Sequence, residues 1–592
     1  MARRARSMAA IEVTREGSQL KKRHFVSLLV PVIAAGVAAL PAAGSNGNGG
    51  GNSHWNSSLT ATNVVVSQPT TGGGYTDVGN APVPGKCGPG PFNANHSESW
   101  LAVKPETDTI VGSSKFFFDK YSTFYNFYLG SLRIENGAAQ SNTIVQGYDC
   151  TTVGTQAMPP SWTNTTDPNV DFDTTGRVYQ TVLPFNAYWT NLHPNGEITV
   201  SYSDDLGDHW FTGNGGQPLE KSPNESSFSF KFEDKQWIAV NHFPTSQYRD
   251  HVYAMWTVFS GCCNQANIRV AVSRDRGKTF SKAMTIVPPK IDQKFNTYVY
   301  PGIDSYGTVY VAYAAFPPRG GNSPAETAAT NHLWVTKSTD DGVTFGPFVQ
   351  ASTARLLEGG AGTLPNTTFR DGITENFAVS PTYPGHLYLT YEDWDGTQFD
   401  VKFTQSINGG TTWSTPVTVN DNAAGDGTDQ FQPSVAAGPN GGVAVAFYDR
   451  RAACPSNQSI IRQDVGRKNF CIDTSLQAYH DYGAGAVPVG ANIRVSNDTW
   501  DPQQPGLLVN PDGTTSNLQT FGGLGQMACS AHNDPCTGSF IGDYFGLAIS
   551  GDNIYTLSVS THYPSNVMSD QGNRLFYQQQ VLGTISRASA GI

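Results

Sequence analysis

The sequence has little charge for its length. Charged residues make up only 14% of the 592 residues. Long amphipathic helices need many Glu, Lys, Leu and Ala residues, so a helical bundle is excluded. What the chain has instead is 62 glycines and 67 aromatic residues, the sum of 25 Tyr, 31 Phe and 11 Trp. This composition is typical of short strands joined by tight turns, and it predicts an all-β protein.

An excess of positive charge is also missing. The formal net charge is −11. A non-specific nucleic-acid binder needs a basic surface to displace the counterions around phosphates. We therefore expect no nucleic-acid partner, and the charge leaves many neutral or polar partners open.

After the N-terminus, the sequence contains no apolar run long enough to cross a bilayer. At the N-terminus, the basic stretch Lys21–His24 precedes an apolar run from Phe25 to Leu40, and small residues follow up to Gly44. The run has about the length of a signal-peptide core and is short for a membrane span. We predict a signal peptide over residues 1–44, a flexible linker over residues 45–58, and a secreted mature chain without a membrane span. An uncleaved anchor is the alternative.

Cysteines number eight, and no Cys-x-x-Cys pair with histidine spacing is present, so a structural zinc site is not expected. An even count in an exported chain favours disulfides. The pairs that we expect are Cys454–Cys471, Cys529–Cys536, Cys87–Cys150 and the adjacent Cys262–Cys263.

Four segments repeat the pattern Ser-x-Asp-x-Gly-x-Thr-Trp/Phe. They begin at Ser203, Ser273, Ser338 and Ser406, and each follows an alternating strand. The first copy has His209 in place of Thr, and the fourth has Asn408 in place of Asp. An Asp or Asn side chain can accept backbone N–H groups within a turn, Gly supplies an unusual backbone angle, and the aromatic residue packs beneath the turn. We therefore interpret these aspartates as turn-forming rather than catalytic.

This pattern resembles the Asp-box, or bacterial neuraminidase repeat, of the sialidase superfamily. The resemblance implies a β-propeller with the Asp-boxes on the face opposite the substrate site. Sialidases of this superfamily also carry an arginine triad, a Tyr nucleophile with its Glu, and an Asp acid/base. Their first arginine lies in an Arg-Ile-Pro motif, which this sequence lacks. Only Arg450 and Arg451 have the context of site arginines, so the scaffold resemblance does not bring the catalytic residues with it.

A second repeat sets the number of blades. Pairs of short apolar strands separated by turns begin near residues 98, 170, 234, 297, 374, 430 and 540. We predict a single propeller over residues 59–585, with seven four-stranded antiparallel blades and a C-terminal tail over residues 586–592. Six blades, as in sialidases, is the alternative. The strand Thr60–Ser67 is expected to pair with Arg574–Gln579 and close the ring, which removes exposed sheet edges.

Polar residues at the starts of the inner strands are the first candidate site, since propeller ligands usually meet the rim where these strands begin. A ring of carboxylates there would supply an acid and a base for glycoside cleavage, or oxygen ligands for calcium. The structural alternative is that these groups bond to inner-strand N–H groups and close the central channel. The candidates are Glu98, Asp173, Asp234, Lys235, Glu375, Gln432, Asp543 and Tyr544.

The segment Tyr448-Asp449-Arg450-Arg451 is the second candidate, because it offers a phenol, a carboxylate and two guanidinium groups together. Arginine forks bind carboxylates such as that of a sialic acid. A surface ion pair at a strand end is the structural alternative.

These features favour a secreted, sialidase-like glycoside hydrolase, with exo-α-sialidase as its specific form, acting on terminal sugars of extracellular glycans. A hydrolase of this kind requires no cofactor, and a bound calcium ion is compatible with the prediction. The alternative is a non-catalytic propeller that binds glycans or proteins outside the cell. A different hydrolase or lyase on the same scaffold is the third possibility.

Overall fold

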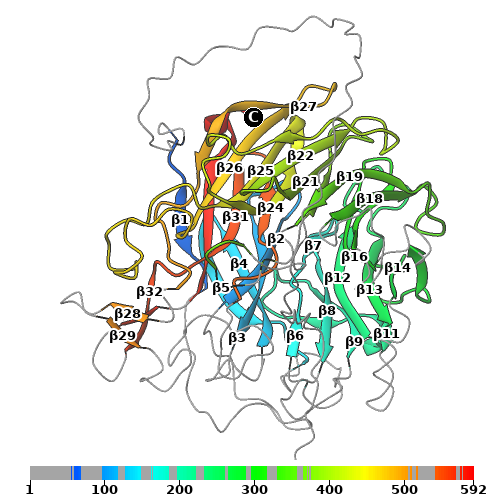
Figure 1. Ribbon diagram of the computed structural model, residues 1–592. Helices are drawn as coiled ribbons and strands as arrows, with labels where there is room; N and C mark the ends of the chain where they lie inside the picture. Colours follow the sequence, from blue (N-terminus) through cyan, green and yellow to red (C-terminus); the bar gives the residue numbers. More distant parts are fainter. Residues whose placement is uncertain are drawn as a thin grey trace, which may run out of the picture.

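The computed structural model describes the parts of the chain that form the ring of blades and some of its loops (Figure 1). The described residues are 55, 59–67, 96–117, 127–148, 162, 164–185, 196–221, 232–260, 265–287, 295–316, 330–356, 364–367, 369, 371, 375–503, 507–509, 515–517, 540–568, 574–576 and 578–592. The predicted signal peptide and the cysteines outside the 454–471 pair lie outside this set.

Seven antiparallel blades make up the fold, as the sequence predicted. Blade 1 holds β2 (His96–Val103), β3 (Ile110–Phe117), β4 (Phe127–Glu135) and β5 (Ala138–Ile144). Blade 2 holds β6 (Asn164–Thr166), β7 (Asp171–Phe172), β8 (Val178–Phe185), β9 (Glu197–Ser203), β10 (Phe211–Thr212) and β11 (Glu220–Lys221). Blade 3 holds β12 (Phe232–Val240), β13 (Val252–Ser260), β14 (Gln265–Ser273) and β15 (Met284–Val287).

The other blades follow in chain order. Blade 4 holds β16 (Phe295–Ile303), β17 (Val309–Phe316), β18 (Thr330–Ser338) and β19 (Val349–Arg355). Blade 5 holds β20 (Glu375–Val379), β21 (Leu387–Trp394), β22 (Phe399–Ser406) and β23 (Val417–Thr418). Blade 6 holds β24 (Gln430–Ala437), β25 (Gly442–Asp449), β26 (Asp473–Asp481) and β27 (Ala486–Arg494). Blade 7 holds β30 (Gly546–Ile549), β31 (Asn553–Ser560), β34 (Gln579–Ser586) and β1 (Thr62–Val65).

A few short elements lie outside the blades. Two hairpins pair β28 (Leu507–Val509) with β29 (Thr515–Asn517), and β32 (Pro564–Met568) with β33 (Arg574–Phe576). Two 3₁₀ turns, η2 (Asn214–Gly216) and η4 (Pro439–Gly441), and the helix α1 (Arg587–Ala590) complete the described elements. Among the described residues, no helix is long and apolar enough to cross a membrane.

Face-to-face packing of the blades explains why the second strands are buried along most of their length. Every residue of β25 is buried, and in β17 all but the last are. A strand with a neighbouring blade on each face loses the alternation of apolar and polar residues that a half-exposed strand shows. The inner strands of successive blades contact one another around the ring, and β2 of blade 1 meets β30 of blade 7.

The N-terminal segment closes the ring, but with a different partner from the expected one. β1 pairs antiparallel with β34, from Thr62↔Thr584 to Val65↔Val581, and Figure 1 shows the blue β1 beside the red strands of blade 7. Of the expected partner Arg574–Gln579, residues 574–576 belong to the β32–β33 hairpin, and Gln579 begins β34. The register continues into Val66, whose N–H donates to the carbonyl of Gln580. A stretch only slightly further along the chain therefore supplies the closing strand.

Residues expected as a linker and as a tail contain anchored side chains. The Trp55 indole N–H donates to Ser475 Oγ at 2.6 Å, and its ring lies 5.3 Å from the Arg451 guanidinium and 5.2 Å from that of Arg494. At the other end of the chain, Arg587 is buried and donates to the carbonyl of Pro439 in blade 6. Both terminal segments thus pack on the ring.

The ring has two chemically different ends, which we call the turn end and the axial end. At the turn end, the first strand of a blade turns into the second, and the third strand also finishes there, as in the pairing of Val252 with Ser273. At the axial end, the inner strands begin. There, β2, β12, β16 and β24 each contain a β-bulge, and Glu98, Lys235, Tyr298 and Gln432 within these bulges have positive φ. A bulge re-aims the side chain that it carries.

Candidate functional site

The four repeated turns lie at the turn end and have the same hydrogen bonds. In the third copy, Asp340 Oδ1 accepts the Ser338 hydroxyl at 2.7 Å and the Thr344 N–H at 2.9 Å, while the Gly342 N–H donates to Ser338 Oγ at 2.9 Å. The other three copies repeat these bonds at Ser203, Ser273 and Ser406. The turn-forming role predicted for these side chains is confirmed.

The substituted residues in two copies keep the bonding intact. In the first copy, His209 Nδ1 lies 2.6 Å from Asp205 Oδ2, where the other copies have a threonine hydroxyl. In the fourth, Asn408 donates from Nδ2 to the Thr412 hydroxyl at 2.7 Å. The three aspartates of the repeat, Asp205, Asp275 and Asp340, have lowered pKa values, because their hydrogen bonds outweigh the opposing effect of burial. Hydrogen bonds within the turn therefore occupy the carboxylate oxygens of these aspartates.

Side chains next to these turns also hold neighbouring blades together. Asp341 of blade 4 accepts the Tyr253 hydroxyl of blade 3 at 2.6 Å and lies 2.8 Å from His251 Nδ1. Arg276 of blade 3 donates to Asp173 of blade 2 at 2.8 Å. The turn end is therefore a belt of contacts between blades.

Asp173 belongs to this belt and not to the axial end, so its expected position is wrong. It follows the inner strand β7 instead of preceding it. Its carboxylate accepts the N–H groups of Thr175 and Arg177 and the hydroxyl of Tyr179, as well as Arg276. The hydrogen bonds to Thr175 and Arg276 hold the pKa of this carboxyl below its ordinary value despite the opposing effect of burial.

At the axial end, charged side chains from four blades converge, all of them buried except the half-buried Lys235. We call Glu98, Lys115, Asp167, Lys235 and Asp543 the axial cluster. Lys235 Nζ lies 2.8 Å from Asp543 Oδ2, and Lys115 Nζ lies 2.8 Å from Glu98 Oε2. Asp167 Oδ2 accepts the Lys235 backbone N–H at 3.1 Å. Two ammonium groups and three carboxyl groups thus lie together at the ring axis.

Gly542 brings Asp543 against Glu98. Its φ is +113°, and a Cβ at this position would lie 2.5 Å from the Glu98 backbone nitrogen. Only glycine allows this approach, so the two acidic residues become neighbours through a backbone contact. The Gly542 carbonyl also accepts Gln432 Nε2 at 2.9 Å, which connects blade 6 to the same point.

Glu98 has an unusual environment for a carboxyl group. Burial raises its pKa to about 7, and the Lys115 ammonium offsets this only in part, while Asp167 and Asp543 raise the pKa further. Near neutral pH this carboxyl therefore retains its proton for much of the time, whereas the neighbouring Asp543 is ion-paired with Lys235.

A second carboxyl pair adjoins the axial cluster from blade 5. Asp371 and Glu392 are both buried and share a hydrogen bond, and Glu392 Oε2 accepts the Gln432 backbone N–H at 2.9 Å. Burial raises the pKa of Asp371 to about 7 and that of Glu392 well above its ordinary value. Asp543 contributes to the upward shift of the pKa of Asp371, as it does to that of Glu98, so its charge acts on both of these carboxyl groups.

Aromatic rings close the ring axis next to the axial cluster. The Trp237 ring centroid lies 4.7 Å from that of Trp100, 4.7 Å from that of Tyr300 and 5.1 Å from that of Tyr544. These rings come from blades 1, 3 and 4 and from the segment before blade 7. The Tyr544 hydroxyl donates to the carbonyl of Pro168. Tyr544, a predicted site residue, is thus part of this aromatic packing.

The structure brings together most of the first set of predicted site residues. Glu98, Lys235, Gln432 and Asp543 meet at the axial end, and Glu375 lies beside Tyr300, whose pKa its charge helps to raise. Asp234 accepts the Lys235 N–H at 2.8 Å. Asp234, Lys235 and Tyr298 are half-buried, whereas Glu98 and Asp543 are fully buried, so the former set is the solvent-facing edge.

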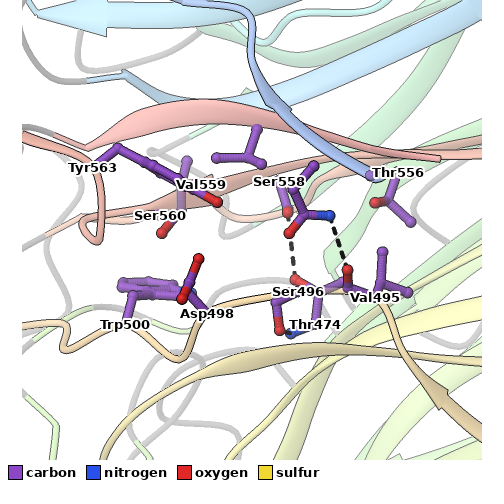
Figure 2. A pocket seen from close by; sticks show the side chains of 13 residues that line it. Thr474, Val495, Ser496, Asp498, Trp500, Thr556, Ser558, Val559, Ser560 and Tyr563 are labelled. Atoms are coloured by element: carbon purple, nitrogen blue, oxygen red, sulfur yellow. Dashed lines mark hydrogen bonds between the residues drawn. The ribbon is translucent and has the colours of Figure 1, made fainter. Parts of the chain in front are cut away.

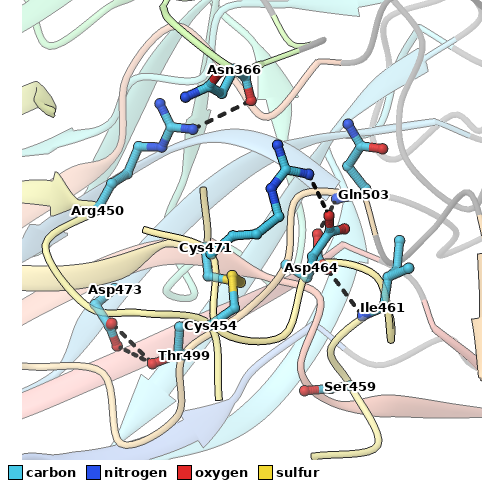
Figure 3. The surroundings of a disulfide bond; sticks show 12 residues. Asn366, Arg450, Cys454, Ser459, Ile461, Asp464, Cys471, Asp473, Thr499 and Gln503 are labelled. Carbon is cyan, nitrogen blue, oxygen red and sulfur yellow. Dashed lines mark hydrogen bonds and ion pairs between the residues drawn. A yellow bond between two sulfur atoms is a disulfide. The ribbon is translucent and has the colours of Figure 1, made fainter. Parts of the chain in front are cut away.

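The second predicted set is built into the scaffold. Arg450 is fully buried and donates to Asp429 Oδ2 at 3.1 Å and to the carbonyls of Pro365 and Asn366 (Figure 3). Burial lowers its pKa to about 10 despite the attraction of Asp429. The fork expected to bind a ligand carboxylate is already filled by the chain's own oxygens, and the ion pair of Arg450 with Asp429 is buried and not at the surface.

Its neighbours have similar internal partners. Asp449 accepts Arg451 Nε at 2.7 Å and the Ser475 hydroxyl at 2.8 Å. The Tyr448 hydroxyl accepts the Val559 N–H at 3.1 Å between blades 6 and 7. None of these groups reaches the axial cluster in the contacts of the described residues.

The predicted Cys454–Cys471 disulfide is present beside this set (Figure 3). It closes the long β25–β26 connection, which also contains the buried Asp464. Asp464 accepts Arg467 Nη1 at 2.6 Å and raises the pKa of Asp501, which burial already shifts upward, to about 7.

A narrow crevice separates blade 6 from blade 7 (Figure 2). It is lined by hydroxyl groups, including those of Thr474, Ser496 and Ser558, and by Trp500 and Tyr563. Nearby, the His562 ring joins Ser459 Oγ, at 2.8 Å from Nδ1, to Asp498 Oδ2, at 3.4 Å from Nε2. Ser459 is buried and does not line the crevice, whereas Asp498 does.

Sequence reasoning missed Lys115, Asp167, Asp371 and Glu392. Lys115 carried a usable signal, because it is the only charged residue in the strand Ile110–Phe117. A buried lysine requires a partner, which predicts a nearby carboxylate. The described residues contain no group of three or more His, Cys, Asp or Glu side chains that could hold a metal ion. The compatibility with calcium therefore stays a prediction.

Comparison with known proteins gives matches to solved structures alone. No protein-family description and no curated protein matches the chain. A protein of unknown function from Dyadobacter fermentans is 11% identical with a TM-score of 0.38, covering 88% of this chain and 97% of its own. The Trypanosoma rangeli sialidase, in complex with sialic acid, is 12% identical with a TM-score of 0.39, covering 89% of this chain and 59% of its own.

The GH93 α-L-arabinofuranosidase of Fusarium graminearum is 15% identical with a TM-score of 0.31, covering 59% of this chain and 92% of its own. Identities and TM-scores this low transfer no activity and no residue role to this chain. The blades themselves define its class, a seven-bladed β-propeller with a buried acidic centre.

Proposed function

We propose that the protein is a secreted glycoside hydrolase whose chemistry takes place at the axial cluster. The observation that carries the proposal is the contrast between two neighbouring carboxyl groups. Burial raises the pKa of Glu98 to about 7 even though Lys115 Nζ lies 2.8 Å from it, whereas Asp543 pairs at 2.8 Å with the half-buried Lys235. Glycoside hydrolysis needs one carboxyl group that gives a proton and one that is ionised. Two neighbouring carboxyl groups whose environments give them different pKa values are therefore candidates for these roles.

In this proposal, Glu98 gives its proton to the leaving oxygen of the glycosidic bond. Asp543 stabilises the positive charge that develops on the sugar ring, or activates the attacking water. The half-buried Asp234, Lys235 and Tyr298 contact the substrate at the solvent-facing edge, where Tyr298 offers an aromatic face 5.3 Å from the Lys235 ammonium. The Asp371–Glu392 pair keeps a second protonated carboxyl near Asp543.

An exo-α-sialidase is the most specific form of this proposal, and Lys235 would then bind the carboxylate of the terminal sugar. Arg450 does not support that role, because Asp429 and two carbonyls already occupy its fork. A sialoside is therefore one substrate to test among several terminal sugars.

A non-catalytic glycan-binding propeller is the second candidate. The observation that favours it is the complete burial of Glu98 and Asp543, since a proton donor must touch its substrate. In that case the buried charges stabilise the ring axis, and binding is confined to the solvent-facing edge.

The test is turnover of fluorogenic glycosides with sialic acid, arabinofuranose, xylose, galactose or glucose at the terminal position. We expect Glu98→Gln and Asp543→Asn each to lower kcat/KM by about 10²-fold or more for the best substrate. Asp340→Asn, at the turn end, is the matched carboxyl-to-amide control and should retain activity. Glycan-array binding by wild type without release of any of the sugars would refute hydrolysis and support the binding protein.

A further inference from the structure

A groove on the outer side of the ring, between blades 4 and 5, has no part in the axial chemistry. It has a volume of about 570 Å³, within the range of small-molecule sites. One wall is β19, the outermost strand of blade 4, and the floor is formed by β21 and β22 of blade 5, which lies next to it in Figure 1. We call it the lateral groove.

Strand pairing places a row of donors across the floor. Tyr391 of β21 is directly opposite Lys402 of β22, and Lys402 is opposite Thr418 of β23. Lys402 Nζ donates to the Thr418 hydroxyl at 2.8 Å, and the Tyr391 hydroxyl lies 2.7 Å from Ser352 Oγ on β19. The floor thus presents an ammonium group between hydroxyl groups that can both donate and accept, and Asp400 Oδ2 of the same strand lies 3.2 Å from this ammonium group.

The wall adds a second cation. The side chain of Arg355, at the end of β19, is 53% exposed, and Nη2 lies 3.3 Å from Asp393 Oδ2. An exposed pair at this distance is weak and is easily replaced by another anion. Arg355, Lys402 and Asp393 are the charged residues that line the groove, and each cation already has one carboxylate partner, Asp393 for Arg355 and Asp400 for Lys402.

From these contacts we infer that the lateral groove binds an acidic oligosaccharide, through carboxylate or sulfate groups on Arg355 and Lys402 and through sugar hydroxyls on Ser352 and Thr418. A guanidinium fork and an ammonium group at one site suit an anionic ligand, and the surrounding hydroxyl groups suit the rest of a sugar chain. This site is separate from the axial cluster and needs no turnover. It extends the proposed function by giving the protein a second place to hold a glycan.

Calorimetry with two hexasaccharides of the same α-1,4 linkage tests the inference. Hexagalacturonate supplies the carboxylates, and maltohexaose is its neutral counterpart. We expect the wild-type protein to bind hexagalacturonate, less tightly as salt rises, and to bind maltohexaose at least tenfold more weakly. Equal binding of the two ligands, or no binding of hexagalacturonate, would overturn the inference.

Variants locate the site. Arg355→Gln combined with Lys402→Met should weaken hexagalacturonate binding at least tenfold. Lys278→Met combined with Lys282→Met removes the same charge from exposed positions of blade 3 and should leave binding within twofold. Asp393→Asn should strengthen binding severalfold, because it removes a competing carboxylate while its amide oxygen can still accept the Arg355 N–H. An unfolded variant would not bind more tightly, so this gain cannot come from a folding defect.

The outcome is independent of the axial proposal. Glu98→Gln should bind hexagalacturonate as the wild type does, whatever its effect on turnover. Loss of hexagalacturonate binding in Glu98→Gln, or an equal loss in the blade 3 control, would show that the ligand binds elsewhere and would overturn the inference.

Discussion

The two ends of the ring use the same residue types in opposite ways. At the turn end, hydrogen bonds within turns and between blades hold the pKa values of Asp173, Asp275, Asp340 and Asp481 below their ordinary value. At the axial end, burial raises those of Glu98, Asp371 and Glu392. The first set is stabilised as anions and the second as protonated acids.

This difference separates the scaffold from the chemistry. Turn-end carboxylates have their oxygens filled by N–H and O–H donors from nearby residues, as Asp340 does. Axial carboxyls come from blades far apart in sequence and are surrounded by one another. The repeated motif therefore stabilises the scaffold, and the unrepeated charged residues at the axial end are the better candidates for a functional role.

The largest expected effect is on stability and comes from breaking a buried ion pair at the axial end. Arg450→Met leaves Asp429 buried without its cation, which should lower the free energy of unfolding by about 3–5 kcal/mol. Arg276→Met removes an arginine of the turn end whose side chain is 37% exposed, and should cost no more than about 1 kcal/mol. Urea denaturation measures both, and equal losses would show that the two ends do not differ in this way.

The next prediction concerns the pH dependence of stability. A carboxyl with a pKa of about 7 in the folded state and 4.5 when unfolded binds more protons folded than unfolded, so its contribution to stability falls as pH rises from about 4.5 to 7. Asp371 acts in the same direction. The turn-end aspartates, whose pKa values are lowered, lose their contribution only as pH falls below 3.8.

Urea midpoints measured between pH 4.5 and 7.5 test this sign. The wild type should become less stable across this range, and Glu98→Gln together with Asp371→Asn should flatten the curve, because amides stay neutral. Asp340→Asn should leave the slope unchanged. The buried His96, whose pKa burial lowers to about 3, acts in the opposite direction, so the contradicting outcome is a slope that Glu98→Gln and Asp371→Asn leave unchanged.

The sequence was sufficient to predict the scaffold because its signals are local. The turn pattern at Ser338–Phe345, and the apolar strand pairs, are each contained in a few residues, and they gave the blade count correctly. The pairing of Cys454 with Cys471 was also predictable, since the two cysteines are only 17 positions apart in the sequence. Asp173 was misplaced because its segment is too short to show which end of the strand it occupies.

The candidate site was only partly predictable, since it depends on contacts between distant segments. Nothing near Arg450 in sequence reveals that Pro365 and Asn366 fill its fork. Asp167 and Asp371 each lie four residues before an inner strand, β7 and β20, and the sequence does not show that they reach the axial end. Their roles become visible only when the ring is closed.

The smallest expected effect tests how far the repeated turns depend on charge. The fourth turn has Asn408, whose Oδ1 accepts the Thr412 N–H at 3.0 Å, much as Asp340 Oδ1 accepts the Thr344 N–H at 2.9 Å. Asp340→Asn should therefore change the free energy of unfolding by less than about 0.5 kcal/mol, whereas Asp340→Ala should cost about 1–2 kcal/mol, because the Thr344 N–H loses its acceptor. If both changes cost the same in urea denaturation, charge rather than hydrogen bonding would hold the turn, and the two ends would be more alike than their contacts indicate.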